Sequence, residues 1–99
     1  MDIPIPVKVL ECFCVYKKKM NEKVISKVLS EDEKSVGFAL HELSERGILV
    51  EEKAHYHLNP DFEGACIKLV DIYKAIKLSK GDKKLYEIYL EEFYRQNLR

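Results

Sequence analysis

Three cysteines and two of the three histidines are the side chains of this sequence best suited to metal or redox chemistry. In a helix, residues i and i+2 point about 200° apart, so Cys12 and Cys14 cannot easily bind one ion. His55 and His57 alternate along an expected strand and share a face, but they lack a third ligand. We therefore expect neither a metal nor a cofactor, with Cys14 and Cys66 as small core residues.

The other polar residues form no motif that is typical of an enzyme. We find no nucleophile elbow, phosphate-binding loop or metalloprotease motif. The carboxylates stand beside lysines on expected helix faces, as solvated surface ion pairs do. The sequence therefore predicts a protein that is not an enzyme.

Charge is unevenly distributed along the chain, although 17 basic residues balance 17 acidic ones. Residues 1–30 carry six lysines against three acids, residues 31–52 carry two basic residues against seven acids, and residues 53–99 carry nine against seven. Lysines near a basic turn could contact phosphates, although each one alone is also explained as a solvated surface charge. These candidates are Lys17, Lys18, Lys19, Lys23 and Lys27.

The bulk composition describes one small globular domain. The chain has 99 residues, of which 46% are hydrophobic and 34% charged. No run of 18 apolar residues could span a membrane. The first residues lack the basic start and apolar stretch of a signal peptide, and three cysteines form no closed disulfide framework. We therefore expect a cytoplasmic protein with reduced thiols.

Apolar spacing predicts three helices in the first half of the chain. The first runs from about Ile5 to Lys18. Asn21 is a plausible N-cap for a short second helix. The sequence from Ser30 to Glu33 has the form of a capping box that opens the third helix, and Gly47 suits a left-handed position after its end.

Two short strands and two helices are expected in the second half. Residues 48–50 and 55–58 have the composition of strands. Asn59-Pro60-Asp61 predicts the start of a fourth helix, with an N-cap, a proline at the first position and an acid in the first turn. Gly81 and Asp82 separate it from a fifth helix.

Residues 35–49, SVGFALHELSERGIL, resemble the third helix of ArsR/MarR-type transcriptional regulators. Residues 56–62, YHLNPDF, are similar to the segment that leaves the wing in ArsR-like proteins. The resemblance covers about residues 7–62. It implies a mainly α fold with a small β-wing, a winged helix-turn-helix in residues 1–60, followed by a C-terminal helical dimerisation extension in residues 61–99.

The resemblance also implies a double-stranded DNA partner, with the third helix in the major groove. The acids of this helix, Glu33, Glu42 and Glu45, are unfavourable near phosphate, although glutamate can accept a hydrogen bond from cytosine. Phe38 could contact a thymine methyl group or be a packing residue. The expected DNA-binding residues are Lys34, Ser35, Phe38 and His41 on this helix, with Lys19, Lys23, Lys53 and His55 outside it.

The last two helices carry more apolar surface than one small domain easily covers. Tyr and Phe, which recur there, are enriched at interfaces. We expect a homodimer through these helices, with packing of both helices inside one chain as the alternative. The expected interface residues are Leu69, Tyr73, Ile76, Leu85, Ile88, Tyr89, Phe93 and Tyr94.

The leading hypothesis is a dimeric DNA-binding transcriptional regulator. The acidic third helix motivates an alternative, a winged-helix protein-interaction module in a transcription, replication or chromosome-organising assembly. A third hypothesis is a metal- or redox-responsive sensor that uses Cys12, Cys14 or Cys66. ArsR-like sensors carry a Cys-x-Cys pair on the helix before the wing, whereas this pair lies on the first helix.

Overall fold

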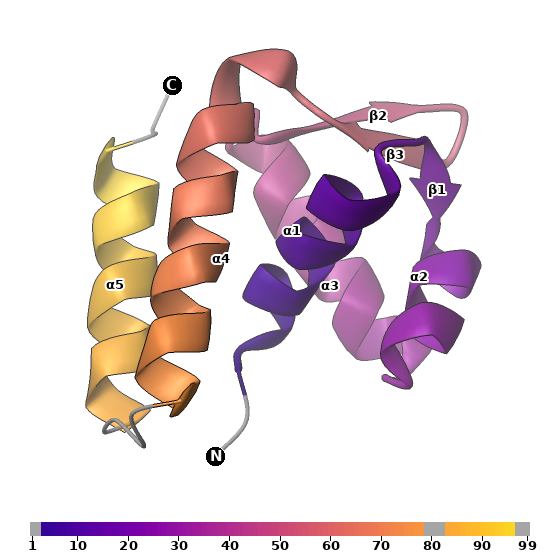
Figure 1. The fold of residues 1–99 in the computed structure, drawn as a ribbon. Helices are drawn as coiled ribbons and strands as arrows, with labels where there is room; N and C mark the ends of the chain where they lie inside the picture. Colours follow the sequence, from indigo (N-terminus) through magenta and orange to yellow (C-terminus); the bar gives the residue numbers. More distant parts are fainter. Residues whose placement is uncertain (1–2, 79–82, 97–99) are drawn as a thin grey trace.

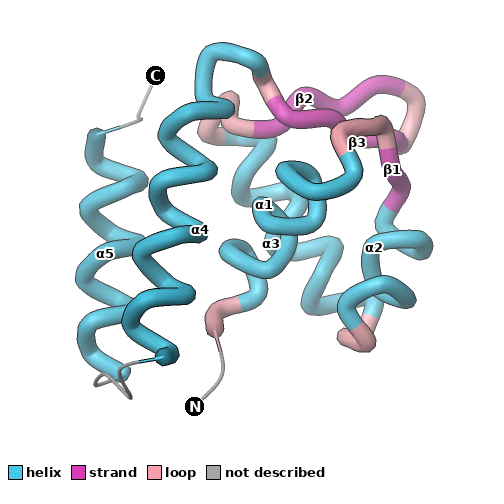
Figure 2. Tube along the Cα trace, viewed as in Figure 1, coloured by secondary structure: helices cyan, strands magenta, loops and turns pink. Residues whose placement is uncertain are grey.

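The computed structural model describes residues 3–78 and 83–96, which form five α-helices and a small antiparallel sheet (Figure 1). The mainly α architecture with a small β element is as expected. Helices make up most of the trace, and short loops join them (Figure 2). The elements are α1 (Ile5–Tyr16), β1 (Met20–Asn21), α2 (Glu22–Leu29), α3 (Glu33–Glu45), β2 (Leu49–Glu52), β3 (His55–Leu58), the 3-10 helix η1 (Pro60–Phe62), α4 (Glu63–Leu78) and α5 (Lys83–Gln96).

The sheet contains one strand that the sequence pattern did not reveal. β1 pairs with β3, and β3 pairs with β2, so the strand order is β1-β3-β2. Two residues are too few to show an alternating pattern, and β1 is defined only by its partner: Met20 lies opposite Tyr56 and Asn21 opposite His55. The hairpin is thereby attached to the segment between α1 and α2.

Helix ends follow the expected capping chemistry except at α3. The Asn21 side chain accepts a hydrogen bond from the Val24 amide at 2.9 Å, as expected for an N-cap. The prediction that residues Ser30 to Glu33 form a capping box at the start of α3 was wrong. Asp32 caps α3, whereas Ser30 has a left-handed backbone (φ 55°) that ends α2. The turn between the two helices is too short for Ser30 to serve both.

The remaining boundaries differ from expectation in small ways. α1 ends at Tyr16 because Lys17 adopts a left-handed conformation. Gly47 has φ 75°, the left-handed conformation expected after α3. The segment after Asn59 begins as a 3-10 turn before α4. Gly81 and Asp82 lie outside the described residues.

One core joins the first three helices, the sheet and the C-terminal helices. α1 is central: it packs against α2, α3, α4 and β3 (Figure 1). Side chains at helical spacing on α3 fill the same core as those of α4, so residues 61–99 contribute to it through their described helices. The largest fully buried side chains include Leu10, Phe13, Ile25, Leu40, Leu43, Ile48, Leu49 and Tyr73. None of the described helices is long and apolar enough to cross a membrane.

The β2–β3 turn allows a test of the backbone geometry. Lys53 and Ala54 have φ 50° and 64°, the pattern of a type I′ turn, which disfavours residues with a Cβ atom. Ala54→Gly should therefore raise the free energy of unfolding by about 0.5–1 kcal/mol, measured by urea denaturation. The matched control is Ala75→Gly on an exposed face of α4, which should lower it by about 1 kcal/mol. Destabilisation by Ala54→Gly would contradict the turn geometry.

Candidate nucleic-acid interface

Helix α3 presents one polar face to solvent because its apolar residues recur at helical spacing on the other. Val36, Ala39, Leu40 and Leu43 are buried. The expected DNA-binding residues Lys34, Phe38 and His41 are exposed, and Ser35 is half-buried. Phe38 is 73% exposed, so it is not a packing residue of this domain. Phe38 is therefore available to a partner that binds this face of α3.

Several polar groups of α3 already have partners within the helix. Asp32 accepts hydrogen bonds from the Lys34 amide at 3.0 Å, the Ser35 amide at 3.3 Å and the Ser35 hydroxyl. The hydrogen bond from the Ser35 side chain is the main cause that lowers the pKa of Asp32. Because Ser35 is engaged in this cap, it is a poorer candidate for base contact than its sequence position suggested.

The acids of α3 are partly balanced by its own cations. His41 Nε2 lies 2.9 Å from Glu45 Oε1, one helical turn away. Arg46 Nη1 lies 3.3 Å from Glu42 Oε1 at the same spacing. Lys34 has no carboxylate within ion-pair distance in the described part of the chain. A partner that approaches this face therefore meets an exposed phenyl ring, one available ammonium group, the exposed carboxylate of Glu33 and two internally paired carboxylates.

The other four expected contact residues form a separate basic edge, consisting of Lys19, Lys23, Lys53 and His55. The pairing of Asn21 with His55 brings the hairpin beside the start of α2, and Lys53 occupies the hairpin turn (Figure 1). Lys19 Nζ lies 2.9 Å from Glu52 Oε2, and this contact lowers the pKa of Glu52. Lys23 and Lys53 are exposed. Strand pairing thus gathers basic residues that are distant in sequence.

The expected dimer residues separate into an inner and an outer set. Leu69, Tyr73, Ile76 and Phe93 are at most 8% exposed within the single chain. The Tyr73 hydroxyl donates to the Tyr86 carbonyl, and the two rings stack at 5.1 Å. These four expected interface residues are thus buried within the single chain, where their surfaces pack in the protomer core.

The outer set remains accessible. Leu85, Ile88 and Tyr89 are 38%, 57% and 40% exposed. These three residues of α5 and Ile72 of α4 are named the outer face. Tyr94 is half-buried instead, with its ring 4.0 Å from the guanidinium carbon of Arg46. This contact joins α5 to the end of α3, and the sequence pattern gave no signal for it because the two residues are far apart in the chain.

Asn59 has a larger role than the N-cap that the sequence indicated. Its Oδ1 accepts from the Asp61 amide at 3.0 Å, as a cap does. Its Nδ2 also donates to the Gly47 carbonyl at 2.9 Å, and its backbone amide donates to the Ile48 carbonyl at 2.9 Å. The end of α3, the hairpin and the start of α4 are joined at this one residue.

The cysteines lie in or beside the core. Cys12 and Cys66 are buried and Cys14 is half-buried. Burial is the main cause that raises the pKa of Cys12 and Cys14, and it raises the pKa of Cys66 to about 12. Among the described residues, no group of three His, Cys, Asp or Glu side chains could hold a metal ion. This environment suppresses the thiolate that redox chemistry requires.

Thiol reactivity gives a direct check. At pH 8 the native protein should react with iodoacetamide more than about tenfold more slowly per thiol than the protein in urea, because raised pKa values and burial both limit the thiolate. Mass spectrometry of time points, resolved by peptide, measures this for each cysteine. Rapid native alkylation of Cys14 or Cys66 would contradict the burial and support a sensor.

Comparison with known proteins adds no assignment. The sequence matches no protein-family model, and no curated protein shows significant similarity to it.

Proposed function

We propose that the chain is a winged helix-turn-helix domain that binds double-stranded DNA as a homodimer and regulates transcription. The observation that carries this proposal is the arrangement of α2 and α3 next to the hairpin. Two short helices joined by a tight turn are followed by a β2–β3 hairpin, and β1 from the α1–α2 connection completes the sheet in the order β1-β3-β2. This element order and the exposed face of α3 support a helix-turn-helix with a wing.

In this proposal the two polar surfaces have different tasks. The exposed face of α3 enters the major groove, where Lys34 reaches phosphate or a base edge and Phe38 contacts a thymine methyl group. The basic edge supplies backbone contacts through Lys23 and Lys53, which are not tied to a carboxylate in the described residues. Lys19 contributes less, because Glu52 balances its charge.

A salt titration of DNA binding tests the proposal. Fluorescence anisotropy on genomic fragments should give an association constant that falls steeply with salt, because phosphate contacts release counterions. Lys23→Gln/Lys53→Gln should reduce the magnitude of the log–log slope for the homodimer by about four, roughly one for each of the two phosphate contacts that each protomer loses. Lys68→Gln on α4 is the matched control and should leave the slope unchanged. The absence of binding at low salt would overturn the proposal.

The homodimer is proposed through the outer face. Leu85, Ile88 and Tyr89 follow one another at helical spacing on α5, and a hollow between α4 and α5 is lined by Ile72 and Tyr89. An accessible apolar stripe at the edge of a small domain is typical of an interface. Two-fold symmetry would place the two α3 helices at half-sites near one helical turn apart.

Sedimentation velocity tests the dimer. The wild type should sediment as a dimer at micromolar concentration, and Leu85→Asp/Tyr89→Asp should sediment as a monomer with an unchanged circular dichroism spectrum. Ile67→Asp is the control, because Ile67 is also exposed but lies about 140° around α4 from Ile72. A monomeric wild type, or a variant that stays dimeric, would refute the outer face. Substitution of Phe93 would unfold the protomer and decides nothing.

A protein-interaction module is the second candidate, and the exposed Phe38 favours it. Phe38 borders an apolar hollow with Ile5, Pro6 and Ala39, and Glu42 lies at its margin. An exposed apolar anchor beside a hollow suits a partner that inserts an apolar side chain there, with Lys34 and Glu42 available for polar contacts at the margin. Failure to bind DNA in the salt titration would favour this function.

A further inference from the structure

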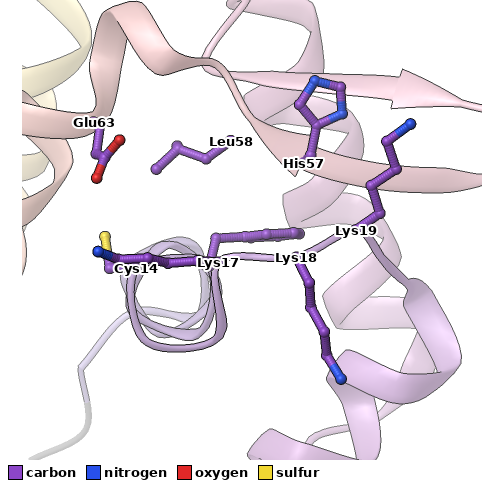
Figure 3. A pocket seen from close by; sticks show the side chains of 8 residues that line it. Cys14, Lys17, Lys18, Lys19, His57, Leu58 and Glu63 are labelled. Carbon is purple, nitrogen blue, oxygen red and sulfur yellow. The ribbon is translucent and has the colours of Figure 1, made fainter.

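A hollow of about 330 Å³ lies where the end of α1, strand β3 and the first residue of α4 meet (Figure 3). Phe13 and Leu58 provide apolar surface. The polar lining comes from three segments that are far apart in sequence. Its members are Cys14, Lys17, Lys18, Lys19, His57 and Glu63. The volume is at the small end of the range for ligand pockets, which suits a small metabolite.

Opposite charges gather at one end of this hollow. In Figure 3 the Lys17 side chain runs toward Cys14, and the Glu63 carboxylate lies at the same end, with Leu58 between this end and His57. Lys18 points away from the hollow in this view. Burial is the main cause that raises the pKa of the Cys14 thiol. The carboxylates of Glu63, Glu11 and Asp71 raise this pKa further, whereas Lys17 lowers it.

These two charged groups are not paired with each other. In the described part of the chain, no carboxylate lies within 4.0 Å of the Lys17 ammonium group, and no cation lies within that distance of the Glu63 carboxylate. Lys17 ends α1 in a left-handed conformation (φ 50°), with its backbone amide bonded to the Phe13 carbonyl. The lining also contains His57 Nδ1, which is buried and has no hydrogen-bond partner among residues 3–78 and 83–96.

We propose that this hollow binds a free α-amino acid with an apolar side chain. The ligand carboxylate would bind the Lys17 ammonium group, the ligand ammonium group would bind the Glu63 carboxylate, and the side chain would lie on Phe13 and Leu58. The α-amino acid head group carries an ammonium group and a carboxylate group on the same carbon atom, which complements an unpaired cation and an unpaired anion at one end of an apolar hollow.

Ligands with one charge fit this lining less well. A simple carboxylate would gain the contact with Lys17 but would be repelled by Glu63. A simple amine would gain the contact with Glu63 but would be repelled by Lys17. Only a zwitterion satisfies both groups. The site therefore discriminates by head group, and this binding goes beyond the proposed DNA function and can be measured with the protein alone.

Isothermal titration calorimetry with the full chain tests the proposal. L-leucine, L-methionine and L-phenylalanine are the probes. The single-charge analogues of leucine are 4-methylpentanoate, which lacks the amino group, and 3-methylbutylamine, which lacks the carboxylate. At least one amino acid should bind saturably, and each analogue of leucine should bind at least about tenfold more weakly than leucine, as expected for loss of a charged hydrogen bond.

Two variants assign the head group to its contacts. Lys17→Gln should reduce leucine binding by about tenfold, to the level of 3-methylbutylamine, and Glu63→Gln should reduce it to the level of 4-methylpentanoate. Lys27→Gln on the exposed face of α2 is the matched control and should bind leucine as the wild type does. Circular dichroism verifies that all three variants fold.

Three results would overturn the proposal. The first is that none of the amino acids binds at millimolar concentration. The second is that 4-methylpentanoate binds as tightly as leucine, which would make the hollow a plain anion site. The third is that Lys17→Gln and Glu63→Gln leave leucine binding unchanged, which would place the ligand elsewhere on the protein.

Discussion

The arrangement of this domain depends on the hydrogen bonds of Asn59. Its side chain both caps the following turn and donates to Gly47, while its backbone amide bonds to Ile48. Three chain segments thereby meet with their polar groups satisfied beside a core in which Ile48 is fully buried. A part-buried hydrogen bond contributes about 0.5–1.5 kcal/mol, and an apolar residue at position 59 would remove both the bond to Gly47 and the cap at Asp61, which would weaken the exit of α3 and the start of α4 together. Because Asn59 both caps the turn before α4 and binds the residue after α3, it fixes the position of each relative to the other.

Each candidate site inherits its geometry from this junction. The hairpin leaves α3 at Gly47 and returns to Asn59, so the direction of β2 and β3 is fixed at both ends. β3 also pairs with β1, and this pairing brings the residues of the basic edge together next to α2. In the other direction, the turn after Asn59 sets Glu63 at the start of α4, opposite the end of α1. The proposed DNA-binding basic edge and the proposed ligand hollow thus both depend on one local structure.

Sequence patterns predicted the features that depend on neighbours along the chain. Helical spacing identified Val36 and Leu40 as buried, and local chemistry identified Asn21 as an N-cap and Gly47 as a left-handed residue. The features that were missed depend on segments far apart. β1 exists only through its pairing with β3, and an amphipathic stripe such as that of Phe93 indicates burial without saying against which chain.

The same limit applies to the candidate sites. All eight expected DNA-contact residues could be named from the sequence, but their division into an α3 face and a basic edge follows from the strand register. The opposition of Lys17 and Glu63 had no signal at all, because a hollow between α1 and α4 is a property of packing. Periodicity places a side chain on a face, and only tertiary contacts determine what that face meets.

The charge of α3 is an example of a property that tertiary contacts alter from what the sequence alone indicates. By composition, residues 31–52 are the most acidic part of the chain. In the fold, however, Glu45 and Glu42 face His41 and Arg46, and the Arg46 guanidinium also stacks on Tyr94 of α5. The contact between Arg46 and Tyr94 packs α5 against the end of α3. The Arg46 guanidinium group contacts Glu42 on α3 and Tyr94 on α5. The charge of the α3 face therefore depends on the packing of a helix that lies about fifty residues further along the chain, which no count of charges in residues 31–52 could indicate.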